Sequence, residues 1–573
     1  DVATDGSKLD GVAASANNYT HPNHSGEVTS TADGATVIAD NIVDEANLKV
    51  SNNPTNGFVL SAQSGNTGGL TWITAPSSGV ATQLTATSNI GLGANAVDSI
   101  STGDNNVGLG DNALTANTSG YQNTAVGHDA LKTNVTAHRS TAFGYEALKT
   151  SNVSGDNFAY NTGLGFRAGR SITTGTNNTA VGANALFANT TAEYNVAIGE
   201  AAGEKLTTGS YNTIIGTKAM KTATTSSRSI AIGVSALQST TTGVDNVAVG
   251  TNALAANTTG AENCAVGRAS LGANISGSYN NAFGWSALGS NTTGAKNAAF
   301  GENSLAANTT ASNNVAIGHD SLKDNITGAT NIAVGFAALT NNTTASNNTA
   351  VGNASLFTNT TGQENSSVGG NSMDSNTTGS YNIAMGYSSL KNNTTGQKNT
   401  AVGQRSMITA TTGNENTCVG REAGSALTTG SNNLLLGQNA GDAGSPSETQ
   451  AGSNKIVLGN NNITHAYVKV DWTIQSDQRD KMNFASVPHG LSFVNSLQPY
   501  KFDFKKARDD ATPHGGTKYG FKAQDVLALE GDNPVIINNE DTNSLKITNS
   551  HLIPVLVKAI QDLSAKVTVL ENA

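Results

Sequence analysis

The chain has 573 residues and a formal charge of −10; 13% of its residues are charged and 63 are glycine. Two cysteines exclude a disulfide framework, and no apolar stretch reaches the length that a membrane-spanning helix needs. The acidic balance disfavours binding to a phosphate backbone. We therefore expect neither nucleic acid nor membrane insertion among the partners.

Residues 1–88 precede the repeats and are expected to form a small β neck or connector. Strand-like runs occur at 47–50, 57–60 and 69–72. His21 and His24 flank Pro22, and their spacing does not suit two ligands on one strand face. This segment therefore predicts a turn, and we expect no metal and no other cofactor.

Residues 89–459 repeat the phrase Asn-x-Ala-(Val/Ile/Phe)-Gly. Its closing glycine occurs 22 times between Gly93 and Gly459, and 19 of the 21 intervals are 17 residues long. We number each coil from this glycine, at offset 0. So strict a period predicts a mainly β protein with a long β-solenoid, or β-roll, of about 22 coils. A single coil is too thin to bury much area, so we expect three chains to associate laterally.

Alternate residues of a strand face opposite sides, which divides the coil into two faces. The apolar residues at offsets −3 and −1 are predicted to fill the interior, and the alanine at −2 to face outward against a neighbouring subunit. Leucine at +4 is predicted to close the interior. In coils with glycine at +4, an apolar residue at +7 is expected to replace it, as at Ile172, Leu206 and Leu427.

Asparagine at offset +7, followed by Thr-Thr-Gly, predicts corners with positive φ and ladders of stacked asparagines. Cys264 at −3 and Cys418 at −2 are expected on opposite faces, as small apolar residues. The two longer intervals, Gly144 to Gly165 and Gly437 to Gly459, must bulge from the coil wall. Bulged loops on a rigid scaffold are where binding residues gather.

The phrase Asn-Val-Ala-Ile-Gly occurs at Asn195–Gly199 and again at Asn314–Gly318. It resembles the repeat of β-roll heads in trimeric autotransporter adhesins and of many phage tail-fibre shafts. The resemblance implies a laterally packed homotrimer.

After a linker at 460–475, the composition changes and the period ends. Residues 476–573 are expected to form an α+β domain that ends in a coiled-coil helix. Ordered motifs lie at 476–481, 490–502 and 519–526. Apolar residues then recur three and four apart, as a heptad seam requires: Ile553, Leu556, Ile560, Leu563, Val567 and Leu570.

Together these segments resemble the self-cleaving intramolecular chaperone domains of phage endosialidase tailspikes and tail fibres. The resemblance implies a cut between Gln475 and Ser476, with Ser476 as nucleophile and Lys481 as general base. Asp477 and Arg479 are expected to form a supporting ion pair that shapes the turn. Asp480 departs from the family's apolar residue and would favour the protonated form of its neighbour, which slows the cut.

These features predict a homotrimeric phage tail fibre, located in the virion tail and matured by single-turnover autoproteolysis. Its partners would be its own copies, a host cell-surface glycan or protein receptor, and tail or baseplate proteins at the N-terminal end. The alternative is a secreted bacterial trimeric surface adhesin or filament, extracellular or on the cell surface. A polysaccharide depolymerase would need paired carboxylates in a groove, and the repeat is poor in Asp and Glu.

Overall fold

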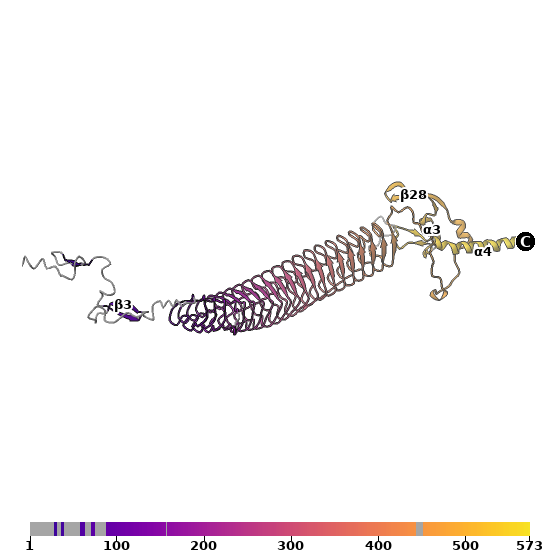
Figure 1. Cartoon of the computed structure of the whole chain (residues 1–573). Helices are drawn as coiled ribbons and strands as arrows, with labels where there is room; N and C mark the ends of the chain where they lie inside the picture. The colour runs from indigo at the N-terminus through magenta and orange to yellow at the C-terminus, as the bar shows by residue number, and fades with distance from the viewer. Residues whose placement is uncertain are drawn as a thin grey trace, which may run out of the picture. The chain divides into compact units, whose positions relative to one another are not determined.

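The structure is a computed structural model that describes four short strands before residue 75 and residues 88–155, 158–442, 451–470 and 472–573. It comprises two units, residues 1–201 and 202–573, and each is described by itself. Figure 1 shows the coils and the labelled elements of the C-terminal domain. His21, His24 and the run at 47–50 lie outside the described residues.

The first unit contains two antiparallel strand pairs followed by parallel coils. Strands β3 and β4 overlap the runs expected at 57–60 and 69–72, and they pair antiparallel, as do β1 and β2. From β5 to β11 each strand pairs in parallel with the strand of the next coil. The strands are β1 Val28–Ser30, β2 Thr36–Ile38, β3 Phe58–Ala62, β4 Leu70–Thr74, β5 Ile90–Leu92, β6 Val107–Leu109, β7 Thr124–Val126, β8 Thr141–Phe143, β9 Thr162–Leu164, β10 Thr179–Val181 and β11 Val196–Ile198.

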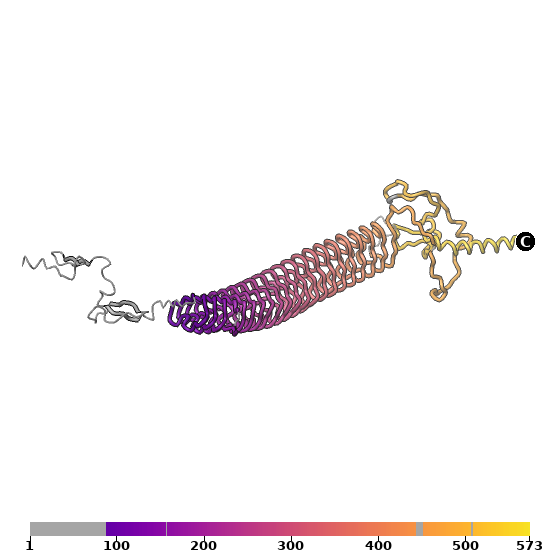
Figure 2. Tube along the Cα trace, in the orientation of Figure 1, coloured from indigo at the N-terminus to yellow at the C-terminus, as the bar shows by residue number. Residues whose placement is uncertain are grey.

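The second unit contains parallel coils of the same kind, followed by the C-terminal domain. Its coils are stacked in register, so that each strand pairs with equivalent residues of the next (Figure 2). The strands are β12 Thr213–Ile215, β13 Ile230–Ile232, β14 Val247–Val249, β15 Cys264–Val266, β16 Asn281–Phe283, β17 Ala298–Phe300, β18 Val315–Ile317, β19 Ile332–Val334, β20 Thr349–Val351, β21 Ser366–Val368, β22 Ile383–Met385, β23 Thr400–Val402, β24 Thr417–Val419, β25 Leu434–Leu436 and β26 Ile456–Leu458. The predicted β-solenoid is therefore confirmed.

The predicted assignment of the two strand faces is wrong. In all 22 coil strands the middle residue, at offset −2, is the buried one. In β18, for example, Ala316 is fully buried together with Leu322 at +4, whereas Ile317 is 42% exposed. The alternation itself holds, but the larger apolar residues at −3 and −1 form an outward face. The alanine thus contacts the coil's own interior and not a neighbouring subunit.

The size of the leucine at +4 explains why the inward residue is small. A Cβ added to Gly163, at offset −2, would lie 2.9 Å from Cγ of Leu148. After two of the glycines that replace this leucine, the inward residue of the next coil is larger. Buried Ile214 follows Gly203, and buried Leu435 lies over Gly424, whose added Cβ would be 3.1 Å from the Leu435 Cδ1 atom. After Gly169 the inward residue remains an alanine, Ala180. The interior is therefore filled by complementary volumes, as close packing requires.

The exchange of leucine at +4 for an apolar residue at +7 is confirmed. The side chains predicted to refill these coils are fully buried: Ile172, Leu206 and Leu427. The two cysteines lie on opposite faces as expected, with Cys418 buried and Cys264 half-buried on the outward face. Burial raises the pKa of the Cys418 thiol to about 12, so this thiol is a small apolar filler.

The asparagines at offset +7 form the predicted ladder inside the solenoid. It runs unbroken through nine side chains from Asn257 to Asn393, and each Nδ2 donates to the Oδ1 of the asparagine one coil earlier at 2.7–3.0 Å. A second buried ladder at offset −4 was not predicted. There the backbone N–H of Asn314 donates to Asn297 Oδ1 at 3.0 Å, and Asn314 Nδ2 donates to the Gly328 carbonyl at 3.0 Å.

The positive φ angles lie elsewhere than at the expected corners. Besides the coil glycine, they occur at offsets −5, +2 and +4, as at Asn313 (62°), Asp320 (55°) and Leu322 (51°). Asn325 and Gly328, in the predicted corner, are absent from the positive-φ residues. Gly328 is required for a different reason, since a Cβ there would collide with the carbonyl oxygen of Ala345 in the next coil.

The C-terminal domain is α+β, as predicted. Its hydrophobic core is formed by buried Phe493, Val526, Ile536, Ile537, Leu552 and Val555. Strands β27 and β28 form an antiparallel hairpin, and helix α2 packs against α4. The elements are η1 Gln478–Asp480, α2 Leu491–Ser496, β27 Tyr500–Ala507, β28 Asp510–Gly520, α3 Ala523–Glu530, β29 Ile537–Asn538, β30 Lys546–Ile547, η2 Asn549–His551 and α4 Leu552–Glu571.

Helix α4 has two apolar faces. Leu552, Val555 and Ala559 are buried against the domain. The six residues of the predicted heptad seam face solvent in the single chain, and Ile560 is 67% exposed. An apolar seam of this kind is the surface through which helices join in a coiled coil.

Candidate autocleavage site

The turn at η1 brings the two ends of the segment 475–481 together. Asp477 caps the turn by accepting a hydrogen bond from the Arg479 backbone N–H at 2.8 Å. The same carboxylate forms an ion pair with the Arg479 guanidinium at 2.7 Å, which lowers the pKa of Asp477. The backbone N–H of Lys481 then donates to the Gln478 carbonyl and closes the turn.

This turn folds Lys481 back onto Ser476. The Lys481 Nζ donates a hydrogen bond to Ser476 Oγ at 2.5 Å. Serine hydroxyls are weak nucleophiles until a neighbouring base takes the proton, and a neutral lysine amine can do so. The five-residue spacing alone did not establish this contact, since it depends on the 3₁₀ turn between the two residues.

The residue before the expected cut is also held by this turn. Gln475 Nε2 donates to the Asp480 carboxylate at 2.6 Å. Among the described residues no ion pair joins Asp480 to Lys481. In the single chain the Asp480 carboxylate therefore positions Gln475, the residue before the expected cut.

The site lies open to solvent in the single chain. Ser476, Lys481 and the residues between them are all exposed. Water stabilises a lysine ammonium, whereas burial favours the neutral amine that a general base requires. The geometry of the pair is thus present in the single chain, and the desolvation is not.

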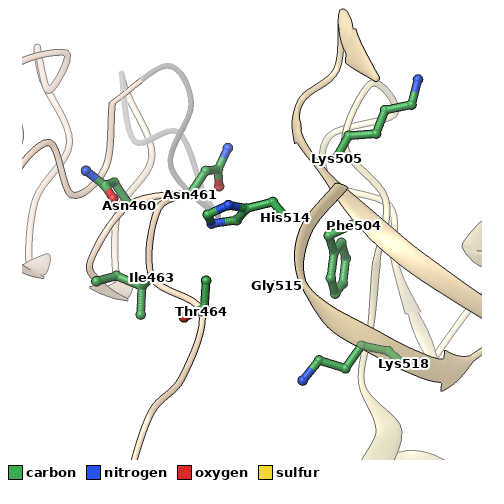
Figure 3. Close-up of a pocket in the computed structure, with 9 residues that line it drawn as sticks. All are labelled: Asn460, Asn461, Ile463, Thr464, Phe504, Lys505, His514, Gly515 and Lys518. Carbon is green, nitrogen blue, oxygen red and sulfur yellow. The ribbon is translucent and has the colours of Figure 1, made fainter. Parts of the chain in front are cut away.

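A small cavity lies between the linker and the β27–β28 hairpin of the second unit. It has a volume of about 310 Å³, and the imidazole of His514 points across it toward Asn460 and Asn461 (Figure 3). The His514 Nε2 atom is buried and has no hydrogen-bond partner among the described residues. The residues that line the cavity are Asn460, Asn461, Ile463, Thr464, Phe504, Lys505, His514, Gly515 and Lys518. Residues of the hairpin therefore line this cavity together with four residues of the linker.

Other classes of site find little support in the described parts of the chain. There, no cluster of three or more His, Cys, Asp or Glu side chains is placed to bind a metal ion. Likewise, no helix in those parts is long and apolar enough to cross a membrane.

The parallel β-solenoid and the α+β domain behind it define a repeat-shaft protein with a C-terminal accessory domain. Residues 476–533 match the family described as "Chaperone of endosialidase". The match begins at Ser476 and covers the turn, the hairpin and α3, so the C-terminal domain is a chaperone of endosialidase domain. A search of curated proteins finds no match to the chain.

Proposed function

We propose that the protein is a homotrimeric fibre of the phage tail-fibre or tailspike kind, which binds a host surface and is matured by its own C-terminal domain. The observation that carries this proposal is the chaperone of endosialidase domain directly behind a β-solenoid. The family is named for a chaperone, and a long parallel sheet needs one, because non-local strand pairing is slow and prone to register errors.

The outward strand face supports lateral association. In the second unit the side chains at −1 are apolar in all 15 strands and form a column along the parallel strands, and the rings of Phe283 and Phe300 stack at 4.9 Å. The side chains at −3 are apolar in nine of the 15 strands. Contiguous exposed apolar surface of this extent marks an interface in soluble proteins. We therefore place the contact between subunits on this face and on the α4 seam, in place of the alanine face that the sequence predicted.

The maturation step follows from the contact between Ser476 and Lys481. Lys481 takes the hydroxyl proton, and Ser476 Oγ bonds to the carbonyl carbon of Gln475. The bond from that carbon to the Ser476 nitrogen breaks, and the nitrogen takes the proton from Lys481. Water then hydrolyses the ester and leaves Gln475 with a carboxylate. Assembly would bury the lysine, so that cleavage follows trimer formation.

The test couples assembly to cleavage. We expect the full chain to form trimers by analytical ultracentrifugation and to release a fragment that starts at Ser476 by mass spectrometry. Replacing two seam residues, Ile560→Asp with Leu563→Asp, should abolish both the trimer and the cut. Val569→Asp is the matched control, since Val569 is exposed on the same helix outside the seam.

Three outcomes contradict the proposal. A monomeric wild-type chain would contradict the proposed trimer. Cleavage of the seam variant at the wild-type rate would contradict the proposed coupling of cleavage to assembly. If the mature protein adsorbs to none of the bacterial strains in a panel, the proposed recognition of a host surface is contradicted.

A further inference from the structure

Aromatic and cationic side chains gather at one corner of the first unit, just before strands β7, β8 and β9. We call Tyr121, His138, Arg139, Phe158 and Tyr160 the corner cluster. The Tyr121 ring stacks on His138 with centroids 3.8 Å apart, and Phe158 meets both rings edge-on at 6.3 and 5.8 Å. Tyr160 extends the stack from Phe158 at 5.4 Å.

The longer interval between Gly144 and Gly165 creates this cluster. Phe158 stands seven residues before its coil glycine, where neighbouring coils have Gly120, Ala137 and Gly175. It bridges in parallel to His138, and the next residue donates its backbone N–H to the His138 carbonyl at 3.1 Å. The longer interval thus places the Phe158 ring on the side of the solenoid, where hydrogen bonds between coils fix the backbone.

Arg139 gives the corner cluster a positive charge. Its guanidinium lies over the Phe158 ring at 4.4 Å, while Nη1 donates to Tyr160 Oη at 2.9 Å and Nε to Gln122 Oε1 at 2.8 Å. Among the described residues no carboxylate forms an ion pair with it. Arg228, at the same offset of a later coil, is paired with Asp245 at 2.7 Å.

The exposed rings and the uncompensated charge suit one class of ligand. Phe158 and Tyr160 are 40% and 44% exposed. The Tyr160 hydroxyl accepts a hydrogen bond from Arg139, whose guanidinium lies over the Phe158 ring. A sugar ring has an apolar C–H face that packs on an aromatic ring and hydroxyls that bond at its rim. A guanidinium pairs with a carboxylate through two parallel hydrogen bonds, and two of the five Arg139 N–H groups are used within the chain.

We propose that the corner cluster binds an acidic saccharide, with Phe158 and Tyr160 as the stacking platform and Arg139 as the partner of the sugar carboxylate. The proposal rests on the function proposed above and names the ligand class and the site for surface recognition. Arg139 has no carboxylate partner among the described residues, so the corner cluster is locally positive although the whole chain carries a net negative charge.

The experiment measures binding of matched acidic and neutral probes to the full-length protein by calorimetry and saturation-transfer NMR. The probes are trigalacturonate with its methyl ester, and 3′-sialyllactose with lactose. We expect an acidic probe to bind at least tenfold more tightly than its neutral partner. Arg139→Gln and Phe158→Ala should each weaken this binding at least tenfold, and salt should weaken it in the wild type.

Two variants at equivalent offsets control for general surface effects. Arg228→Gln removes an exposed arginine, and Tyr279→Ala removes a tyrosine that is 51% exposed. Both should bind the probes as the wild type does. The site is overturned if no acidic probe binds more tightly than its neutral partner, or if Arg139→Gln binds like the wild type.

Adsorption to bacterial cells separates this site from the proposed function. If the wild type and Arg139→Gln adsorb equally, the site is wrong and surface recognition stands. If the wild type adsorbs to no cells yet binds acidic probes through Arg139, surface recognition is wrong and the site stands. Adsorption that is lost after protease treatment of the cells, but not after periodate treatment, indicates a protein receptor and also overturns the site.

Discussion

Ser476 and Lys481 contact each other because the residues between them form a capped 3₁₀ turn. A nucleophile and its base can therefore come from a single short segment, without help from the rest of the fold. The segment does not desolvate the lysine, since all of its residues are exposed. The proposed dependence of cleavage on assembly rests on this division.

At this scale we predict that Ser476→Ala and Lys481→Ala both give soluble, uncut trimers. The wild type should yield residues 1–475 and a 98-residue fragment, because 573 − 475 = 98. Loss of the base should slow the cut by about 10²–10⁴-fold. Intact mass spectrometry over a time course checks both variants. A fragment beginning at position 476 from the Ser476→Ala protein would remove the serine from this role.

A second prediction concerns two buried carboxylates of the first unit. Burial disfavours the ionised form of Asp129, but hydrogen bonds from Lys149, Lys132 and Asn112 outweigh it and lower its pKa to about 2. The pKa of Glu146 is also lowered to about 2, chiefly by Lys149, against the opposing effect of burial and with help from Arg170. Both carboxylates therefore stabilise the fold when ionised.

The sign of the pH dependence follows from linkage. A carboxyl whose folded pKa lies below its unfolded value of about 4 stabilises fully above pH 4, and the stabilisation is lost as pH falls toward 2. We expect pepsin to cut within residues 121–187 more readily at pH 2.5 than at pH 4.5. Glu146→Gln should reduce the difference in cleavage between the two pH values, because the region would then be susceptible to pepsin at both. Equal protection of the wild type at both pH values would contradict the assignment.

At the scale of one element, the coil is held together by its interior asparagines as much as by its apolar residues. Asn325 Nδ2 donates to Asn308 Oδ1 at 3.0 Å and to the Gly328 carbonyl at 2.8 Å, and its Oδ1 accepts from Asn342 at 2.8 Å. The ladder ends at Asn393, whose Oδ1 has no partner where Ala410 follows at the same offset. Between Asn257 and Asn393 each interior asparagine thus hydrogen-bonds the next.

We therefore predict that Asn325→Leu destabilises the solenoid although it adds apolar volume. It would leave Asn308 Oδ1 without its donor and Asn342 Nδ2 without one acceptor, at a cost of about 2–4 kcal/mol. Thr327→Ala, at an exposed position of the same coil, is the control. Thermal unfolding followed by circular dichroism measures the change. A Tm equal to or above the wild type would show that the ladder contributes no stability.

The period of the coil makes a further prediction for deletions. Removing residues 315–331, one unit of 17, keeps every offset in place, and the shortened chain should fold. Removing residues 315–322 shifts the following residues by eight positions, so that strand residues lie opposite loop residues of the preceding coil and the stacking in register is lost. The first variant should sediment as a trimer and the second should aggregate. If both form trimers of equal Tm, one coil is not the structural unit.

At the scale of the whole molecule, the C-terminal domain has a core of its own and an apolar seam without a partner in the single chain. Such a domain can join three chains before the strands pair, because a helical nucleus forms faster than a long parallel sheet. Once assembled, the trimeric shaft would remain folded after release of the C-terminal domain, because its unfolding would be slow.

We predict that a chain ending at residue 475 aggregates or stays monomeric when synthesised without residues 476–573. The same 1–475 segment, produced by cleavage of the full chain, should remain a soluble trimer. Analytical ultracentrifugation of the two preparations compares them directly. A soluble trimer from the truncated gene would show that the domain is not needed for assembly.

The sequence by itself determined the repeat, its period, the change of fold near residue 476 and the residues of the candidate cleavage site. The repeat and the change of fold follow from periodicity and composition, which are properties of the chain order. The candidate cleavage residues were instead given by the resemblance of their segment to the self-cleaving chaperone domains. The +7 ladder and the exchange of Leu for Ile172, Leu206 and Leu427 were predicted from the periodicity and are observed.

Only the tertiary structure decided which strand face is the interior. Size suggested the valines and isoleucines, but the leucine at +4 leaves room only for a small residue at −2. The structure alone also revealed the −4 ladder, the 2.5 Å contact between Lys481 and Ser476, and the rings that meet around Arg139. In each case the partners lie in different coils or across a turn. Their contact depends on backbone geometry that residue spacing does not specify.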